Sequence, residues 1–592
     1  MKKEQAARVK INKLLEGAGW CFFDSDKERA NIQLENKTAI KQVELDALGD
    51  DFENTKNGYI DFLLLDTKGF PLVVLEAKRE GINPLSAKSQ ARDYASSVHA
   101  PFVILSNGNI HYLWDVKSGD PQLITRFPTQ DSLLKYKDYS PNPKGLSDEN
   151  VEMDYIAKSQ NPNFGKDPRW NSDDLTRQEY ISSARLKLMR PYQVEAVKAV
   201  QKSASRESTR YLLEMATGTG KTLVTAAVAK LFLRTGNAQR VLFLVDRIEL
   251  EDQALKAFRE YLKDDYIILV YKNNRDNWAS AQIVISTVQT LLSNDCYSKE
   301  FSPTDFELVI SDEAHRSIGN NSRAVFEYFV GYKLGLTATP KDYLKNVNLE
   351  APGSQREIER RQLLDTYKTF GCEGREPTYK YSLLDGVKEG YLINPVVVDA
   401  RTEVTTQLLS DEGYAVSVID EEKEEQLKVY YANHFEKKFF NDETNLIFCK
   451  TIIENALRDP VSAEMGKTIV FSVSQNHAAK ITNLLNQLAS HYWPGKYKSD
   501  FAEQVTSNVK EAQRQTINFA NNRLNGRSGF LEGYDTSKTR VCVTVGMMTT
   551  GYDCQDILNV VLMRPIFSPA DFIQMKGRGT RKYNFRAIDS TE

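Results

Sequence analysis

The feature that most constrains the fold is a glycine-bearing loop at residues 215–222, with the sequence Met-Ala-Thr-Gly-Thr-Gly-Lys-Thr. An apolar run at 211–213 precedes the loop and predicts a buried strand, and the apolar spacing of 223–231 predicts a helix. A glycine loop between a strand and a helix start turns backbone N–H groups and the positive end of the helix toward one point. The sequence therefore predicts an α/β fold with an anion-binding site at this loop.

The residue types in this loop suit the phosphates of a nucleotide. The residues expected to contact the nucleotide are Thr217, Gly218, Thr219, Gly220, Lys221 and Thr222. The glycines let the backbone approach phosphates closely, the lysine reaches the outer phosphates, and the hydroxyl of Thr222 can bind Mg²⁺. The full phosphate-loop pattern has glycine at the position of Met215, so this match is incomplete when taken alone. An ordinary glycine turn before a helix is the alternative for the loop in isolation.

Length and composition bound the class of protein. A chain of 592 residues predicts several domains, because single cores rarely grow beyond about 250–300 residues. Six cysteines lie far apart without CxxC spacing, which argues against disulfides and zinc and suits the reducing cytoplasm. The N-terminus does not resemble a signal peptide, and no apolar run is long enough to span a membrane. The net charge of −3 decides little about nucleic acid, because the sum hides local patches.

The N-terminal region contains two β-rich runs, 58–66 and 71–78, around a glycine turn, which predicts a hairpin. Positions two apart on a strand share a face, so Glu76 and Lys78 project together, and Asp61 on the partner strand could meet them. Two carboxylates and an ammonium at one strand end make a metal-dependent hydrolytic site. Asp61 and Glu76 would hold Mg²⁺, and Lys78 would orient the attacking water. A strand that ends in solvated charges is the alternative.

The next helix adds a second pair of polar residues to this region. Gln90 and Tyr94 lie four apart on one helix face, and a strand at 102–105 follows. Together with the two carboxylates and the lysine, they resemble the PD-(D/E)xK nuclease core, in the variant found in the motor subunits of type I restriction enzymes. The resemblance implies that Gln90 and Tyr94 help to position DNA and metal at the active site. Ile60 stands where the proline that names the superfamily would be.

Downstream of the phosphate loop, apolar runs at 241–245, 283–285 and 306–310 predict buried parallel strands. Asp312 and Glu313 follow the last of these runs, within an Asp-Glu-Ala-His sequence. A carboxylate at the strand end can hold the Mg²⁺ that bridges nucleotide phosphates, and the neighbouring glutamate can polarise the attacking water. The hydroxyl residues at 286–287 follow the second run, at a strand end where open α/β sheets place ligands, and helix capping is the simpler alternative for each of them.

Several segments between 190 and 581 resemble, in order, the motifs of superfamily 2 helicases. They are Gln193, residues 216–222, the Asp-Glu-Ala-His sequence, Thr337-Ala338-Thr339-Pro340, residues 549–553 and residues 574–581. The resemblance implies that Gln193 contacts adenine and that residues 286–290 hold one nucleic-acid strand. In that family the loop pattern begins at Ala216, so the methionine before it is no defect.

The last of these segments resembles the arginine-finger motif of the same superfamily. Gln574, Arg578 and Arg581 are spaced at i, i+4 and i+7, which predicts one helix face. The resemblance implies that the two arginines stabilise charge on the γ-phosphate, and that Gln574, Gly551 and Asp553 help to form the nucleotide site. A solvated polar stripe is the alternative for this face.

A nuclease core followed by this motor looks like the R (motor and cleavage) subunit of a type I restriction–modification enzyme. The expected parts are a nuclease domain at 1–145, a linker at 146–185, and RecA-like lobes at 186–375 and 376–592. Family chains usually continue into a helical domain that docks on the methyltransferase, so this chain is expected to be truncated.

The resemblance implies an ATP-dependent translocase of double-stranded DNA and a Mg²⁺-dependent endonuclease that cuts unmodified DNA. It also implies methyltransferase and specificity subunits as partners, with S-adenosylmethionine bound only by the methyltransferase. Two alternatives remain open. One is a stand-alone helicase–nuclease in repair or defence, and the other is a DNA-tracking scaffold with an inert nuclease.

Overall fold

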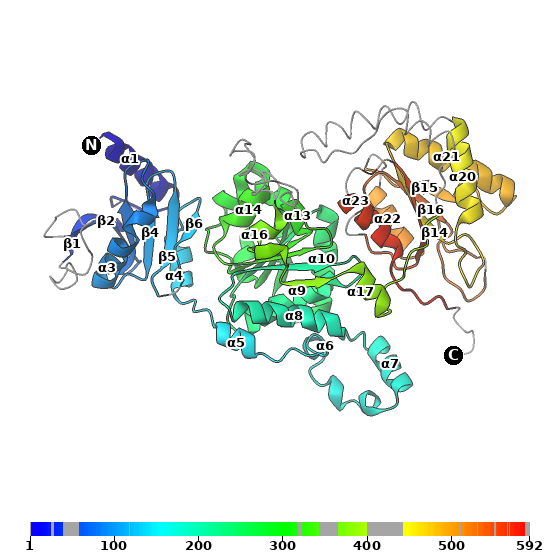
Figure 1. Ribbon diagram of the computed structural model, residues 1–592, viewed down its shortest axis with the longest axis horizontal. Coiled ribbons are helices and arrows are strands. Elements are labelled where there is room, and N and C mark those ends of the chain that lie inside the picture. The colour runs from blue at the N-terminus through cyan, green and yellow to red at the C-terminus, as the bar shows by residue number, and fades with distance from the viewer. Residues whose placement is uncertain are drawn as a thin grey trace. The chain divides into compact units, whose positions relative to one another are not determined.

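A computed structural model describes residues 2–24, 29–38, 58–117, 119–263, 265–317, 322–341, 365–398, 442–507, 509, 511–529, 531–549, 552–564, 566 and 569–586. The chain divides into two compact units. The first comprises Met1–Leu213, Thr222–Leu336 and Lys341–Tyr379, and the second comprises Glu214–Lys221, Thr337–Pro340 and Lys380–Glu592. Figure 1 labels their helices and strands. Among the described residues, no helix combines the length and the apolar character needed to cross a membrane.

The N-terminal part of the first unit is built on a six-stranded sheet with the strand order β1-β2-β3-β4-β5-β6 (Figure 1). Its strands are β1 (Ile32–Thr38), β2 (Gly58–Leu65), β3 (Pro71–Ala77), β4 (Phe102–Ser106), β5 (His111–Asp115) and β6 (Gln122–Ile124). β2 pairs antiparallel with β3, so the predicted hairpin is confirmed. β3 and β4 are parallel, because α3 (Lys88–Val98) provides the crossover connection between them.

Alternating side chains of this sheet pack on two different helices. Phe62 and Leu75 belong to a core cluster with Ile11 and Leu15 of α1 (Lys2–Gly17). Leu63, Leu65 and Val74 belong to a second cluster with residues of α3. The two-residue period of the strands therefore produces two core layers. It also determines that Glu76, two residues after Val74, points toward α3.

Residues 143–186, most of which the sequence predicted as a loosely packed linker, form short helices. These are α5 (Pro143–Asp148), α6 (Ala157–Gln160) and α7 (Asp174–Ser183). They bury a small cluster of Ala157, Phe164, Tyr180 and Leu186. The polar residues that resembled linker composition act as helix caps: the side chains of Asn142, Asp167 and Asp173 accept backbone N–H groups. The segment is therefore a packed element rather than a loose connector.

A set of side-chain hydrogen bonds, which we call the α4 seam, joins residues 129 and 132 to residues 302–305 within the first unit. Ser132, on α4 (Gln130–Lys137), lies with its Oγ 2.5 Å from Oγ1 of Thr304 and donates to Asp305 at 2.9 Å. The backbone N–H of Thr129 donates to the hydroxyl of Ser302 at 3.3 Å. The N-terminal sheet is thus tied by buried polar groups to the chain that leads into the next sheet.

The second sheet has seven strands in the order β13-β7-β12-β11-β8-β10-β9. Its strands are β7 (Arg210–Met215), β8 (Val241–Val245), β9 (Ile268–Val270), β10 (Ile283–Thr287), β11 (Leu308–Asp312), β12 (Tyr332–Thr337) and β13 (Tyr379–Tyr381). The pairs that join β9, β10, β8, β11 and β12 are all parallel. The predicted α/β fold with a parallel sheet is therefore confirmed for this region.

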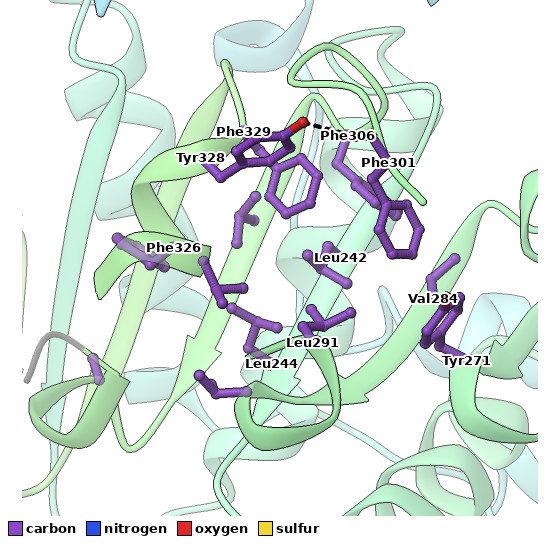
Figure 2. Close-up of a cluster of buried hydrophobic side chains, with 14 of the residues drawn as sticks. Leu242, Leu244, Tyr271, Val284, Leu291, Phe301, Phe306, Phe326, Tyr328 and Phe329 are labelled. Carbon is purple, nitrogen blue, oxygen red and sulfur yellow. Dashed lines mark hydrogen bonds between the residues drawn. The ribbon is translucent and has the colours of Figure 1, made fainter. Parts of the chain in front are cut away.

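Figure 2 shows the core on one side of this sheet. Leu242, Leu244 and Val284 of the strands are fully buried in one cluster with the rings of Phe301, Phe306, Phe326, Tyr328 and Phe329. The hydroxyl of Tyr328 donates to the carbonyl oxygen of Phe301 at 2.7 Å, so this buried polar group is paired. Since the strands that bear the polar site residues run through this core, their carboxyl ends are held by rigid packing.

The second unit contains a four-stranded parallel sheet with the order β15-β16-β14-β17. Its strands are β14 (Lys467–Ser472), β15 (Ala502–Gln504), β16 (Val541–Thr544) and β17 (Ile557–Met563). Helices α20 (Asp442–Asn455) and α21 (Gln475–Tyr492) supply apolar residues to one of its core clusters. The helix α23 (Pro569–Lys576) precedes the last predicted motif residues.

Candidate functional sites

The predicted nuclease residues lie together at one end of the β2–β3 hairpin. Phe62 pairs with Leu75 in the antiparallel register. Asp61, one residue before Phe62, and Glu76, one residue after Leu75, therefore lie at neighbouring positions on the two strands. Asp61 Oδ2 accepts the backbone N–H of Ala77 at 2.8 Å, so this carboxylate is fixed against the end of β3. Lys78 Nζ lies 3.2 Å from Glu76 Oε1. The hairpin therefore brings two carboxylates and one ammonium group into one site.

Helix α3 adds the predicted glutamine and tyrosine to the same site. Lys78 Nζ donates to Gln90 Oε1 at 3.4 Å, and Gln90 Nε2 donates to the hydroxyl of Tyr94 at 3.0 Å. Tyr94 is buried in the core cluster beneath α3, which fixes the position of its hydroxyl. The five residues that the sequence proposed are thus connected, either by hydrogen bonds or through the hairpin register.

Asp61 and Glu76 are adjacent, buried carboxylates, and burial raises the pKa of each. Burial, followed by the negative charge of Asp61, raises the pKa of Glu76 to about 7. Burial also raises the pKa of Asp61, although the N–H of Ala77 and the guanidinium of Arg8 act in the opposite direction. Glu76 is 4% exposed, and its Oε2 has no hydrogen-bond partner among the residues that the structure describes. A buried carboxylate oxygen in this state is destabilising unless a cation or a proton satisfies it.

These oxygens fit a hard divalent cation. Mg²⁺ is commonly held by one or two carboxylates and several waters, and Asp61 and Glu76 provide such a pair. Within the described ranges, no group of three or more His, Cys, Asp or Glu side chains is arranged to hold a metal ion. A cation at this pair would therefore complete its coordination with water or with a substrate oxygen.

Arg8 is a site residue that the sequence did not indicate. Its Nη2 donates to Asp61 Oδ1 at 2.5 Å. Arg8 lies on α1, more than fifty residues before the hairpin, and no motif surrounds it. An arginine on an amphipathic helix is usually a solvated surface residue, so only the folded structure reveals this contact.

The phosphate loop has the expected strand–loop–helix form. It follows β7 and leads into α9 (Lys221–Arg234). Gly218 and Gly220 have φ of +82° and +77°, a conformation that favours glycine. The hydroxyl of Thr219 donates to the carbonyl of Ala216 at 2.6 Å, and Lys221 Nζ lies 3.5 Å from the carbonyl of Met215. Thr217 is buried, whereas Thr222 is partly exposed in the first turn of the helix.

Asp312 and Glu313 stand at the carboxyl end of β11, where open parallel sheets place ligands. Asp312 Oδ1 accepts the N–H of Glu313 at 3.0 Å. Glu313 has φ of +48°, and its Oε2 lies 3.6 Å from His315 Nδ1. A left-handed conformation costs a glutamate roughly 1–2 kcal/mol, and strain of this kind gathers at active sites. The conformation is consistent with a functional role for Glu313.

The structure supports the simpler interpretation at two other motif positions. Thr287 Oγ1 accepts the N–H of Thr290 at 3.0 Å and so caps α11 (Val288–Leu292). Gln193 is 3% exposed, and its Oε1 accepts the N–H of Arg190 at the start of α8 (Pro191–Ala204) at 2.8 Å. Both side chains have local structural roles, and their predicted contacts to nucleic acid and adenine remain predictions.

The predicted continuous helix face from Gln574 to Arg581 is wrong. Helix α23 ends at Lys576, and Gly577–Gly579 forms a short 3-10 turn, because glycines at 577 and 579 do not favour a continued helix. Arg581 instead forms an isolated antiparallel bridge with Leu392. The motif residues are therefore arranged by a turn and a bridge rather than by helical periodicity.

The two arginines of this motif have different environments. Arg578 is buried, and its guanidinium donates to the carbonyls of Thr549 at 2.7 and 3.0 Å and to that of Tyr552 at 2.5 Å. Arg581 Nη1 pairs with Asp553. Within the same unit, a methyl group added at Gly218 would lie 3.3 Å from Cγ of Arg581. The side chain of Arg581 therefore lies beside the phosphate loop, whereas that of Arg578 is bonded to the backbone of its own unit.

Two further residues, Gln574 and Gly551, are predicted to contact nucleotide. Gln574 is 1% exposed at the end of α23. Gly551 lies outside the described residues.

Two family models match separate segments of the chain. Residues 186–342 match the family model "Type III restriction enzyme, res subunit", and residues 39–128 match "Type I restriction enzyme R protein N terminus". The chain is 26% identical over 533 residues to the type I restriction enzyme EcoAI endonuclease subunit of Escherichia coli, covering 88% of this chain and 57% of the relative. It is 27% identical over 448 residues to the EcoKI endonuclease subunit of Escherichia coli K12, covering 68% and 34%.

A solved structure of the ATP-dependent Type ISP restriction-modification enzyme LlaBIII bound to DNA covers 72% of this chain and 29% of its own, at 16% identity and a TM-score of 0.43. The comparison depends on the sequence matches to the two Escherichia coli subunits. They confirm the resemblance to the endonuclease subunits of type I restriction enzymes that the motifs predicted. The chain spans 57% of the first relative's length and 34% of the second's.

Proposed function

We propose that this chain is the motor and cleavage part of a type I restriction–modification enzyme: an ATP-hydrolysing translocase of double-stranded DNA joined to a Mg²⁺-dependent endonuclease. The nuclease part of this proposal depends on the buried Asp61–Glu76 pair. Glu76 Oε2 has no hydrogen-bond partner among the described residues, and a bound cation would satisfy it. The sequence matches to endonuclease subunits over 88% and 68% of this chain support the combination.

In this proposal, residues 1–145 form a PD-(D/E)xK nuclease domain, and residues 186–375 and 376–592 form two RecA-like lobes. Asp61 and Glu76 hold Mg²⁺, which when bound would neutralise charge developing on the scissile phosphate. Lys78, held between Glu76 and Gln90, orients the attacking water and helps to activate it. Tyr94 fixes Gln90, which keeps the amide directed at the site.

For the motor, Lys221 and the loop N–H groups bind the outer phosphates of ATP, and Thr222 and Asp312 hold its Mg²⁺. Glu313 polarises the attacking water, and its strained backbone positions the carboxylate at the strand end. Arg581 is the preferred arginine finger, because the guanidinium of Arg578 is already committed to three backbone hydrogen bonds. Such a finger contributes roughly 10³–10⁵ in rate in related systems.

The testing experiment is an assay of ATP hydrolysis and DNA cleavage on unmethylated circular DNA with Mg²⁺. It is run with and without the cognate methyltransferase and specificity subunits. The proposal predicts that both activities require those subunits and that methylated DNA supports neither. Cleavage and ATP turnover of equal rate without the subunits would instead indicate a stand-alone helicase–nuclease. ATP turnover with intact DNA under every condition would indicate a tracking scaffold with an inert nuclease.

A further inference from the structure

Arg8 has no role in the proposed chemistry, yet it contacts a residue that is central to it. Its guanidinium donates to Asp61 Oδ1 at 2.5 Å, while the N–H of Ala77 occupies Oδ2 at 2.8 Å. Both oxygens of Asp61 are therefore engaged. The side chain of Arg8 is 36% exposed and that of Asp61 is 17% exposed, so the pair is within reach of solvent.

The Arg8–Asp61 pair is not needed to hold α1 in place. Ala7, Ile11 and Leu15 of the same helix are all fully buried, and the two larger residues belong to the core layer beneath the helix. Apolar burial of this kind contributes more than a partly exposed ion pair, whose typical value is about 0–1 kcal/mol. A function at the site is thus a better explanation for the contact than docking of the helix.

The charges of the site explain what that function is. When both carboxylates are ionised, as metal binding requires, Asp61 and Glu76 are balanced by two cations, Arg8 and Lys78. A divalent cation added to this neutral set would leave two excess positive charges in a partly buried site, which is unfavourable. The excess falls if Arg8 leaves Asp61, and it falls further if a DNA phosphate approaches.

We propose that Arg8 is a built-in cation that competes with the divalent metal for Asp61 Oδ1 and is released to a DNA phosphate, so that metal binding and DNA binding are coupled. This inference rests on the proposed nuclease function. Arg8 is a positioning residue in this account: it lowers metal affinity in the absence of DNA, and its guanidinium suits a phosphodiester when DNA is present. The coupling disfavours a metal-loaded nuclease that has no substrate.

The test is a titration of the 592-residue chain with Mn²⁺, followed by the electron paramagnetic resonance signal of free Mn²⁺, without nucleotide. The binding that Glu76→Gln removes is assigned to the site. Arg8→Gln and Arg8→Met should each tighten this binding about tenfold, since each removes one adjacent positive charge. Arg8→Lys should bind Mn²⁺ as the wild type does, because it keeps the charge.

Lys10→Gln is the matched control. Lys10 lies on the same helix and pairs with Glu80 instead of Asp61, so its Mn²⁺ affinity should equal that of the wild type. A short DNA duplex should tighten Mn²⁺ binding to the wild type several-fold more than to Arg8→Gln. Thermal unfolding of each variant verifies that it is folded.

The outcomes separate this inference from the proposed function. Arg8 variants that bind Mn²⁺ no more tightly than the wild type, or a Lys10→Gln variant that gains as much as they do, would overturn the role of Arg8. Mn²⁺ binding that Glu76→Gln does not weaken would instead overturn the nuclease assignment itself.

Discussion

The two candidate active sites differ in how much of the chain each one draws on. The candidate nuclease site is assembled by one hairpin and the two helices that cover its sheet, and all its residues lie between positions 8 and 94. The residues proposed to bind nucleotide lie at positions 193 to 581, much further apart along the chain. One site is a local product of a single sheet, whereas the other depends on separate pieces of structure.

The two candidate sites are also stabilised by different interactions. The nuclease carboxylates are buried by their own hairpin and balanced by Arg8 and Lys78, so the site is held together by the fold of one domain. The nucleotide residues have local partners instead, such as Asp553 for Arg581 and Arg190 for Gln193. A substitution in one site should therefore leave the structure and ligand binding of the other unchanged, although cleavage still depends on ATP hydrolysis.

The largest effect is expected for Asp61→Ala. Loss of a metal-binding carboxylate should reduce DNA cleavage about a thousandfold or more, because the cation supplies several kcal/mol of transition-state stabilisation. ATP hydrolysis should be unchanged. Nicking of supercoiled DNA and phosphate release measure the two activities. Glu80→Gln, which removes a neighbouring surface carboxylate, is the control and should cut normally. Normal cleavage by Asp61→Ala would contradict the nuclease site.

Lys221→Ala should lower ATP hydrolysis on the order of a thousandfold, since the phosphates lose their cation in the loop. Cleavage that depends on ATP should disappear with it. Binding of Mn²⁺ at the nuclease site should remain at the wild-type value, which distinguishes loss of the motor from general damage. The exposed Lys202→Ala, at the end of α8, is the control for removal of a lysine. ATP turnover that survives Lys221→Ala would exclude the proposed motor site.

Glu76→Gln should change the pH dependence of stability when a chelator removes metal. Because the pKa of Glu76 is raised from 4.5 to about 7 on folding, its protonated form is favoured in the folded chain. That contribution is complete below pH 4.5 and is lost as the pH rises through 7. Glutamine does not ionise, so the variant should match the wild type near pH 4.5 and exceed its stability by about 3 kcal/mol at pH 8. Denaturant unfolding at the two pH values measures the difference, and the opposite sign would refute this account of Glu76.

The smallest effect is expected for Gly218→Ala, about a tenfold loss of ATP affinity measured by nucleotide titration. Its φ of +82° strains any other residue, and the added methyl group would lie 3.2 Å from Leu392 and 3.3 Å from Arg581. Gly236→Ala is the matched control, because Gly236 has φ of +73° but no atom within 4 Å of the new methyl group. Both variants should lose roughly 1 kcal/mol of stability, and only the first should bind ATP less well. Equal ATP affinity in the two would argue against a crowded loop.

The strands that carry the motifs were predictable because they are buried on both faces. The apolar run at 241–245 coincides with β8, and the run at 71–78 differs from β3 by one residue. β1 was missed because its sequence, Ile-Gln-Leu-Glu-Asn-Lys-Thr, is mostly polar, as is common for a strand at a sheet edge. Periodicity identifies strands that build the core and is weak for strands that only border it.

The site residues also divide into those that the sequence located and those that it did not. Motif spacing located Asp61, Glu76, Lys78, Gln90 and Tyr94, because their separation along the chain reflects one hairpin and one helix. The spacing of Gln574, Arg578 and Arg581 wrongly predicted one continuous helix face, because two glycines interrupt the helix. Arg8 could not be found at all, since its contact with Asp61 depends on how α1 packs across the sheet.

The α4 seam affects how the first unit unfolds. The hydroxyls of Ser132 and Thr304 and the carboxylate of Asp305 are matched to one another across the two sheets of the first unit. Melting either sheet alone would leave the other with buried polar groups that have lost their partners, which is costly. The N-terminal sheet and the seven-stranded sheet are therefore expected to unfold in one cooperative step, although their sequences match two different family models.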